Sequence, residues 1–145
     1  MDEEQPPLKR IIYTSRCDRY MSSSELAQII ASSYTRNFRN NITSLLLVKQ
    51  DTFFQVIEGP EVAVEFLFEN ICRDTRHWAV EPELEEFVSQ RLFPRSPMIF
   101  HCFENVVTTH PFGFLRGEDD WGMNYESTSE GDATLDMVEQ FLASA

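Results

Sequence analysis

Residues 42–60 read ITSLLLVKQDTFFQVIEGP, with an apolar, β-branched run on either side of the polar stretch KQDT. Two such runs joined by a short polar turn are typical of a β-hairpin. Because neighbouring positions in both runs are apolar, we expect other parts of the chain to cover both faces of the sheet. Gln55 interrupts the second run with an amide, and a buried amide without partners costs about 1–3 kcal/mol.

Five further elements are predicted around the hairpin from apolar patterns and flanking signals: a strand at residues 8–15, a helix at 24–38, a helix at 61–74, a strand within 75–93 and a strand at 96–103. Ser22 to Ser24 offer an N-cap for the first helix. Gly59 and Pro60 end the second hairpin strand, and Pro60 suits the first turn of the helix that follows. Pro82 predicts a break or bend in the fourth strand.

The order β-α-β-β-α-β-β defines an α+β fold, the ferredoxin-like plan with an added strand. We expect one domain over residues 8–103, after a flexible N-terminus at residues 1–7. Residues 104–145 are predicted to form a C-terminal helical extension with a loop near 116–131. The two main helices would cover one face of the sheet and the extension the other. The apolar residues at helical spacing in the extension are Leu135, Val138, Phe141 and Leu142.

The composition restricts the classes of function. Among 145 residues, 12 Lys and Arg stand against 24 Asp and Glu, a net charge of −12. This charge disfavours nucleic acid and membrane surfaces as partners, because affinity for phosphate groups depends on positive charge. The chain has neither an apolar signal region nor a run near the roughly 20 apolar residues of a membrane span. Cys17, Cys72 and Cys102 form no C-x-x-C pair, so we expect no metal site, no disulfide framework and a reducing, cytoplasmic location.

Side-chain spacing predicts a polar cluster between the two helices. The stripe of the first helix that begins at Leu26 becomes polar at Ser33 and Asn37. These two residues either face a group that needs hydrogen bonds or mark where the helix emerges into solvent. Tyr13 and Gln55 lie on strand faces that can turn toward the same helices. The cleft they would form holds either a flat, hydrogen-bonding ligand or a satisfied core network.

The second helix has a wide apolar arc, and Glu65 and Glu69 alone face outward clearly. Such an arc predicts a second apolar neighbour, either a ligand ring or the first helix. The residues of the arc are Val62, Ala63, Val64, Phe66, Leu67, Phe68 and Ile71.

Four stretches, RIIYTSR, RNNITSLLL, FFQVIEGP and DTRH, stand in the order and spacing of a known family. On these stretches the chain resembles the BLUF family, the blue-light sensors that use flavin, over about residues 8–103. The resemblance implies the ferredoxin-like sheet predicted above, with the isoalloxazine ring of a non-covalently bound flavin between the two helices. FAD is the flavin it implies first, with FMN and riboflavin as alternatives.

The resemblance also implies a role for each matching residue. Tyr13 matches a tyrosine that hydrogen-bonds to the key glutamine and gives an electron to the excited flavin. Gln55 matches that glutamine, which contacts the N5 and O4 region of the ring. Asn37 matches an asparagine that holds the ring's carbonyl and N3 edge, and Ser33 matches a polar position nearby. Met98, predicted on the fifth strand, matches a methionine close to the glutamine.

Three basic residues, Arg36, Arg76 and His77, and two departures complete the comparison with the family. Arg76 and His77 match a pair near the outer edge of the ring, although such a pair at a helix end is also typical of a C-cap. Arg36 either reaches the ligand or faces solvent. Ser96 stands where many members have a tryptophan, which bears on any mechanism that uses that tryptophan. Ser44 stands where a glycine is usual, and we interpret it as a local packing change.

The predicted function is that of a photoreceptor and not of an enzyme. Light would drive an electron and then a proton from Tyr13 by way of Gln55, leaving the amide rotated or tautomerised and the flavin red-shifted. The signal would pass through Met98, the fifth strand and the C-terminal segment to an unidentified downstream protein or a second copy of the chain. The alternatives are an acylphosphatase-like hydrolase and a flavin-free interaction module of the same fold. The hydrolase predicts a glycine-rich loop after the first strand, and TSRCDRYMSSS contains no glycine.

Overall fold

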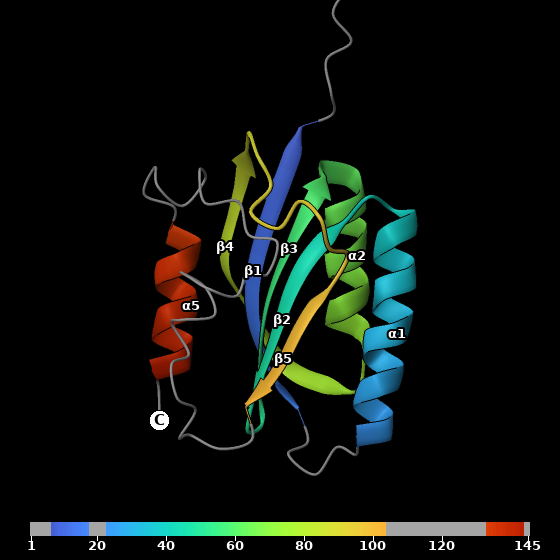
Figure 1. Ribbon diagram of the computed structural model, residues 1–145, viewed down its shortest axis with the longest axis vertical. Coiled ribbons are helices and arrows are strands. Elements are labelled where there is room, and N and C mark those ends of the chain that lie inside the picture. The colour runs from blue at the N-terminus through green and yellow to red at the C-terminus, as the bar shows by residue number, and fades with distance from the viewer. Residues whose placement is uncertain (1–6, 18–22, 104–132, 144–145) are drawn as a thin grey trace, which may run out of the picture.

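A computed structural model (Figure 1) describes residues 7–17, 23–103 and 133–143. Its elements are, in chain order, β1 (Leu8–Cys17), α1 (Ser23–Arg39), β2 (Thr43–Lys49), β3 (Thr52–Pro60), α2 (Glu61–Arg73), β4 (His77–Val88), β5 (Ile99–Phe103) and α5 (Ala133–Ala143). The predicted cap at Ser22, most of the predicted flexible N-terminus and the predicted loop near 116–131 lie outside the described residues.

The five strands form one mixed sheet in the order β4-β1-β3-β2-β5. β3 pairs antiparallel with both β1 and β2, β4 pairs antiparallel with β1, and β5 pairs parallel with β2. In Figure 1, α1 and α2 lie on one side of the sheet and α5 lies on the other. The predicted fold class, an α+β ferredoxin-like sheet with an added strand, is confirmed.

The β2–β3 hairpin occupies the centre of this sheet. Lys49 pairs with Thr52 across a two-residue turn, and Gln50 in that turn has a φ of 57°, the left-handed conformation that the tightest hairpin turns favour. At the far end of β3, a Cβ on Gly59 would lie 2.8 Å from the carbonyl oxygen of Asn41. The glycine is therefore required there by the close approach of the two backbones.

Each face of the sheet has its own apolar core. On the helix side, buried residues of the sheet pack against α2 in a cluster of Ile11, Ile42, Ile57, Val64 and Leu67. On the other side, α5 packs on the sheet in a cluster of Ile12, Leu45, Leu47, Phe54, Val56, Leu92, Phe93, Val138 and Leu142. The prediction that a C-terminal helix covers the second face is confirmed.

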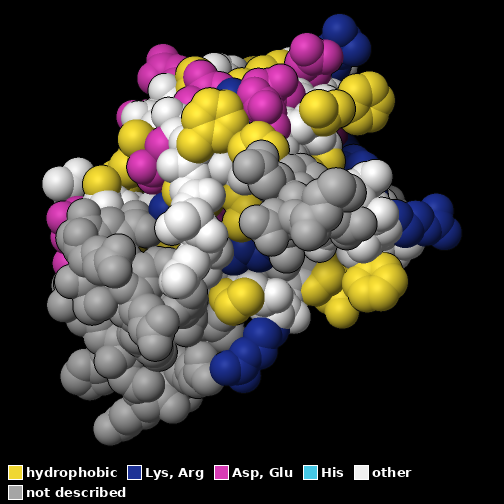
Figure 2. Space-filling view, turned by 90° about the horizontal axis from the view of Figure 1, so that it is seen from above, with side chains coloured by type: hydrophobic (Ala, Val, Ile, Leu, Met, Phe, Trp, Pro, Cys, Tyr) yellow, Lys and Arg dark blue, Asp and Glu magenta, His cyan; other side chains and the backbone are white. Residues whose placement is uncertain are grey.

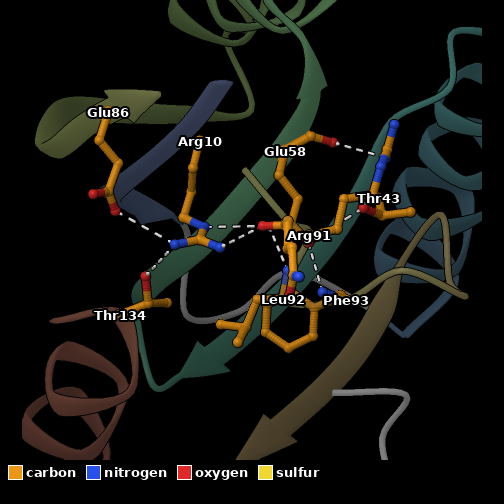
Figure 3. A network of polar contacts seen from close by, with 9 residues as sticks. Arg10, Thr43, Glu58, Glu86, Arg91, Leu92, Phe93 and Thr134 are labelled. Atoms are coloured by element: carbon orange, nitrogen blue, oxygen red, sulfur yellow. Dashed lines mark hydrogen bonds and ion pairs between the residues drawn. The ribbon is translucent and has the colours of Figure 1, made fainter. Parts of the chain in front are cut away.

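A buried ion pair lies on the α5 side of the sheet. Arg10 of β1 donates from Nε to Glu58 of β3 at 3.2 Å, and both side chains are buried. The Glu58 carboxylate also accepts the backbone N–H groups of Leu92 and Phe93 at 2.9 and 2.6 Å. Arg10 reaches α5 by donating to Thr134 Oγ1 at 3.4 Å. These residues, which we call the Arg10–Glu58 network, join two strands, the segment after β4 and α5 (Figure 3).

The other end of α5 is held by Lys49. Its Nζ donates to the carbonyl oxygens of Phe141 and Leu142 at 3.3 and 3.0 Å. These carbonyls belong to the last turn of the helix, where a cation also complements the helix dipole. Cations from β1 and β2, the two strands that flank β3, therefore contact α5 at its first and last turns.

β4 forms one edge of the sheet and is irregular. Its pairing with β1 shifts register on either side of Pro82, and Ala79 has a φ of 54°, so the predicted bend is confirmed. Three carboxylates of the strand, Glu81, Glu83 and Glu85, are exposed.

The surface of α2 differs from the prediction. Val62 and Phe66, expected to lie against a second apolar neighbour, are 80% and 66% exposed. The prediction of a continuous covered arc on α2 is wrong at these two positions, because α1 lies beside α2 rather than over it (Figure 1). In the view onto the end of the molecule where α2 begins, hydrophobic side chains are visible among acidic ones (Figure 2).

None of the helices in the described ranges is long and apolar enough to cross a lipid bilayer. Within the same part of the chain, the His, Cys, Asp and Glu side chains form no group of three that could hold a metal ion.

Candidate functional site

Tyr13 and Gln55 are direct partners across β1 and β3. Their side chains are 2% and 6% exposed, and the Tyr13 hydroxyl donates a hydrogen bond to Gln55 Oε1. Burial raises the pKa of the Tyr13 phenol far above its ordinary value. The phenol is therefore neutral and holds its proton against the amide oxygen.

A cleft between α1 and α2 opens onto this pair. Its lining combines apolar side chains with a comparable number of polar and charged ones, so it offers a small ligand both apolar surface for affinity and polar groups that fix orientation. The lining residues are Tyr13, Leu46, Phe53, Gln55 and Met98 from the sheet and its edge, Ile29, Ser33 and Arg36 from α1, and Leu67, Asn70, Ile71, Asp74, Arg76 and His77 from α2 and the segment after it.

Asn37 lies one turn beyond Ser33 and is completely buried, although it does not line the cleft itself. Its Nδ2 donates to the carbonyl oxygen of Pro97 at 2.9 Å and to Ser44 Oγ at 3.3 Å. Its Oδ1 is buried without a hydrogen-bond partner. An unpaired buried carbonyl costs about 1–3 kcal/mol, so this atom suits a ligand that brings an N–H donor.

Three charged side chains line one side of the cleft. Arg76 donates to the Asp74 carboxylate from Nε at 2.9 Å and from Nη2 at 2.5 Å, and this pairing lowers the pKa of Asp74. Arg36 donates to Ser33 Oγ at 3.5 Å, and burial together with the nearby Arg76 lowers the pKa of Arg36. Arg36 lines the cleft and is also exposed to solvent, so both of its sequence alternatives stay open.

His77 joins the end of α2 to β1. Its Nε2 lies 2.6 Å from the carbonyl oxygen of Ile71, and its Nδ1 lies 2.7 Å from Ser15 Oγ. Since a carbonyl can only accept, Nε2 carries the hydrogen, and in the neutral ring Nδ1 accepts from the serine hydroxyl. His77 thus holds a carbonyl of the last turn of α2 and lines the cleft at the same time.

The structure brings together most of the predicted site residues. The residues that line the cleft are Tyr13, Ser33, Gln55, Arg76, His77 and Met98, with Asn37 buried behind it. Ser33 and Asn37 are buried, so the alternative that α1 emerges into solvent at these positions is wrong. Met98 precedes β5, which begins at Ile99, so its predicted place on the fifth strand is wrong by one residue.

The sequence analysis missed Asn70 and Asp74, which also line the cleft. Both follow Leu67 at helical spacing, so the second helix has a stripe that begins apolar and becomes polar, as the first helix does. The same pattern test, applied to both helices, would have found them.

The structure thus places a cleft beside a buried tyrosine–glutamine pair, and comparison with known proteins identifies the class of the protein. The family model BLUF, described as sensors of blue-light using FAD, matches residues 8–99, more than half of the chain. The chain belongs to the BLUF family. Its fold and family are those of flavin-binding sensors of blue light.

Two solved structures show the same architecture. The chain matches BlrB, a BLUF protein in its dark state, with a TM-score of 0.68 and 26% identity, over 97% of this chain and 98% of that one. It matches a calcium/cyclic-diGMP complex of Klebsiella pneumoniae BlrP1 with a TM-score of 0.78 and 26% identity, over 94% of this chain and 34% of that one.

The curated relatives that the chain matches are longer than this chain. The blue light- and temperature-regulated antirepressor BluF of Escherichia coli (strain K12) is 29% identical over 91 residues, 63% of this chain. The photoactivated adenylate cyclase subunit beta of Euglena gracilis is 31% identical over 104 residues, 72% of this chain. The chain spans 23% and 12% of the lengths of these two relatives.

Proposed function

We propose that the chain is a blue-light photoreceptor in which light rearranges the hydrogen bond between Tyr13 and Gln55. The observation that carries the proposal is this bond, a buried phenol donating to a buried amide on the wall of a cleft. A pair of apolar side chains at these positions would avoid the desolvation of both polar groups. The amide instead offers a donor and an acceptor that can exchange places.

The chain's own residues move one electron and one proton. A bound flavin supplies a ring that absorbs blue light and, once excited, accepts an electron. Tyr13 gives up the electron, which makes its phenolic proton strongly acidic, and Gln55 Oε1 already accepts that proton's hydrogen bond. The electron and the proton then return to Tyr13. The composition of both residues is restored, and the lasting change is a Gln55 amide that has rotated or tautomerised.

The remaining residues of the site would hold the flavin. The unpaired Asn37 Oδ1 suits the ring's imide N–H group, and Ser33 adds a hydroxyl on the same helix face. Met98 lies on the wall shared with Gln55. His77 and Arg76 close the side of the cleft beyond α2.

We infer FAD as the flavin, with FMN and riboflavin as the other candidates. The family is described by its use of FAD, and one related structure is of Klebsiella pneumoniae BlrP1 with FMN. The cationic side chains of Arg36 and Arg76 along the cleft suit a flavin that carries phosphate groups.

We also infer that residues 8–103 are the sensing domain, that residues 104–145 are the output segment, and that the chain acts through another molecule and not as an enzyme. Support comes from the match with BlrB along nearly the whole length of both chains. Met98 connects the cleft to β5, which lies next to β2. The receiver is a separate effector protein or a second copy. The acylphosphatase-like alternative is not favoured by the family match.

The absorption spectrum of the purified full chain tests the proposal, measured in the dark and after blue illumination. We expect flavin absorption and a red shift that decays in the dark. Tyr13→Phe should bind flavin and lose the shift, because the ring remains and the proton is gone. Tyr34→Phe, at a half-exposed tyrosine of α1, is the matched control and should keep it. A colourless protein, or a normal shift in Tyr13→Phe, contradicts the proposal.

A further inference from the structure

Ser44 connects the buried amide of Asn37 on α1 to the segment that leads into β5. The residue is completely buried on β2. Its backbone N–H donates to the carbonyl oxygen of Ser96 at 3.2 Å, and its Oγ donates to the carbonyl oxygen of Pro97 at 2.7 Å. The same Pro97 oxygen and the same Ser44 Oγ accept from Asn37 Nδ2. Ser44, Asn37 and Pro97 therefore form a closed triangle of hydrogen bonds.

The triangle fixes which end of the Asn37 amide is free. The Pro97 carbonyl can only accept, so the amide atom that faces it must be the nitrogen. The hydrogen of the Ser44 hydroxyl is used toward the same carbonyl, which leaves the hydroxyl as an acceptor on the side of Asn37. A flipped amide would lose its bond to the Pro97 carbonyl, and the Ser44 hydroxyl could donate to Oδ1 only by giving up its own bond to Pro97. Oδ1 is thus held as the free atom of the amide, buried and without a partner.

We propose that Ser44 is a positioning residue, which locks the Asn37 amide with its oxygen free and so makes the site select a ring edge that carries an N–H donor. The inference rests on the proposed function, since the ligand is taken to be a flavin. It adds to that function a specificity determinant that lies outside the cleft, because Ser44 is not among the residues that line it.

If the Ser44 hydroxyl locks the Asn37 amide, the preference of the site for a ring with an N–H donor should depend on that hydroxyl. In flavins the relevant donor is the imide N3–H, and a methyl group on N3 removes it. With the amide locked, the methylated ring meets an oxygen that cannot turn away. Without the hydroxyl, the amide is held by one bond in place of two and can rotate, so the site should tolerate the methylated ring better.

The test compares two ligands and three proteins. The full chain is freed of flavin and titrated with riboflavin and with 3-methylriboflavin, as the wild type, Ser44→Ala and Thr35→Ala. Thr35 is the matched control, since its hydroxyl bonds only to the carbonyl of Ala31 within α1. We expect the wild type and Thr35→Ala to prefer riboflavin about tenfold or more, and Ser44→Ala to lower that ratio about fivefold.

The ratio of the affinities for riboflavin and 3-methylriboflavin distinguishes a positioning role of Ser44 from a purely structural one. A Ser44→Ala protein that binds both ligands more weakly with an unchanged ratio overturns the proposal, because a purely structural residue affects both equally. Ser44→Thr, which keeps the hydroxyl, should retain the wild-type ratio. Wild-type protein that binds riboflavin without any preference over 3-methylriboflavin overturns this inference alone, whereas no binding of riboflavin overturns the proposed function as well.

Exchange of side-chain amide protons in the wild-type protein offers a second test that needs no variant. The side-chain amide protons of Asn37 should exchange with solvent much more slowly than those of Asn40, whose Nδ2 donates to a helix carbonyl at the exposed end of α1. Equal exchange rates for the two amides would show that Asn37 is not locked and would overturn the proposal.

Discussion

β3 presents a buried polar side chain to each side of the sheet, and the two sites are completed in different ways. On the α5 side, the Glu58 carboxylate accepts from Arg10, from the hydroxyl of Thr43 and from two backbone N–H groups. On the helix side, Gln55 accepts from Tyr13 at the wall of a cleft, and the nearby Asn37 keeps an unpaired oxygen. The chain itself satisfies the Glu58 carboxylate on the α5 side, whereas on the helix side the described residues supply no partner for Asn37 Oδ1.

This difference indicates how one strand can support both stability and signalling. Removing one partner of a buried, fully paired charge is strongly destabilising, so the α5 side should resist rearrangement. A neutral amide that has an alternative set of partners can rearrange at small cost. The predictions below separate the two sites by what each substitution changes.

The largest effect is expected at Glu58. Glu58→Ala leaves Arg10 and two backbone N–H groups buried without the carboxylate, and should lower the free energy of unfolding by about 3–5 kcal/mol. Urea unfolding followed by circular dichroism measures it. Glu65→Ala is the matched control, because its ion pair with Lys9 is exposed on the Glu65 side and worth about 0–1 kcal/mol. Equal losses in the two variants would show that the Arg10–Glu58 network is not a unit of stability.

Gln55→Leu should impair the light response much more than the stability of the fold. The light-induced red shift should be lost, while the free energy of unfolding falls by only about 1–3 kcal/mol, because the Tyr13 hydroxyl loses its partner. Adding Tyr13→Phe should recover most of that stability without recovering the shift. Gln28→Leu, at an exposed position of α1, serves as the control. A red shift of normal size in Gln55→Leu would remove the distinction between the two sides of β3.

A smaller effect is expected at Asn37. Asn37→Ala removes the acceptor that suits the ligand, so flavin affinity should fall about fivefold to tenfold. Fluorescence titration with flavin measures the change. Asn40→Ala, three residues further along and exposed, should leave the affinity unchanged. Unaltered affinity in Asn37→Ala would mean that the unpaired oxygen does not meet the ligand.

The smallest effect is expected at Lys49. Lys49→Met keeps the apolar stem but removes the cation from the last turn of α5, so the amide protons of α5 should exchange about fivefold faster. The sheet should keep its protection. Lys9→Met, which alters a cation paired with α2 on the helix side, is the control. If the α5 amide protons exchange no faster in Lys49→Met than in the wild type, the docking of α5 on the sheet depends on apolar packing alone.

The central hairpin and much of the cleft could be predicted from the sequence because their signals are local. Alternation along a strand fixes the face of Tyr13 and of Gln55, and helical spacing places Ser33 and Asn37 together. The pairing of β1 with β3 then follows from the fold class. It sets Tyr13 directly opposite Gln55.

What could not be predicted depends on contacts between distant residues. Arg10 and Glu58 are 48 positions apart, and a charged residue in a strand gives no sign that its partner is buried with it. The role of Ser44 depends on the carbonyl of Pro97, which no side-chain pattern reveals. The exposure of Val62 and Phe66 depends on how α1 and α2 lie side by side. The sequence shows that a residue is apolar but not which neighbour covers it.

The acidic edge at β4 has a consequence for how copies of the protein meet. An edge strand offers unpaired backbone groups to which another sheet can add. Here Glu81, Glu83 and Glu85 of that edge strand are exposed, and Pro82 provides no N–H. Two such edges would bring carboxylates together and repel within a range of about 8–10 Å set by dissolved salt. Edge-to-edge growth into fibres is therefore disfavoured, least strongly at high ionic strength, and a second copy that associates with this chain would do so through another surface.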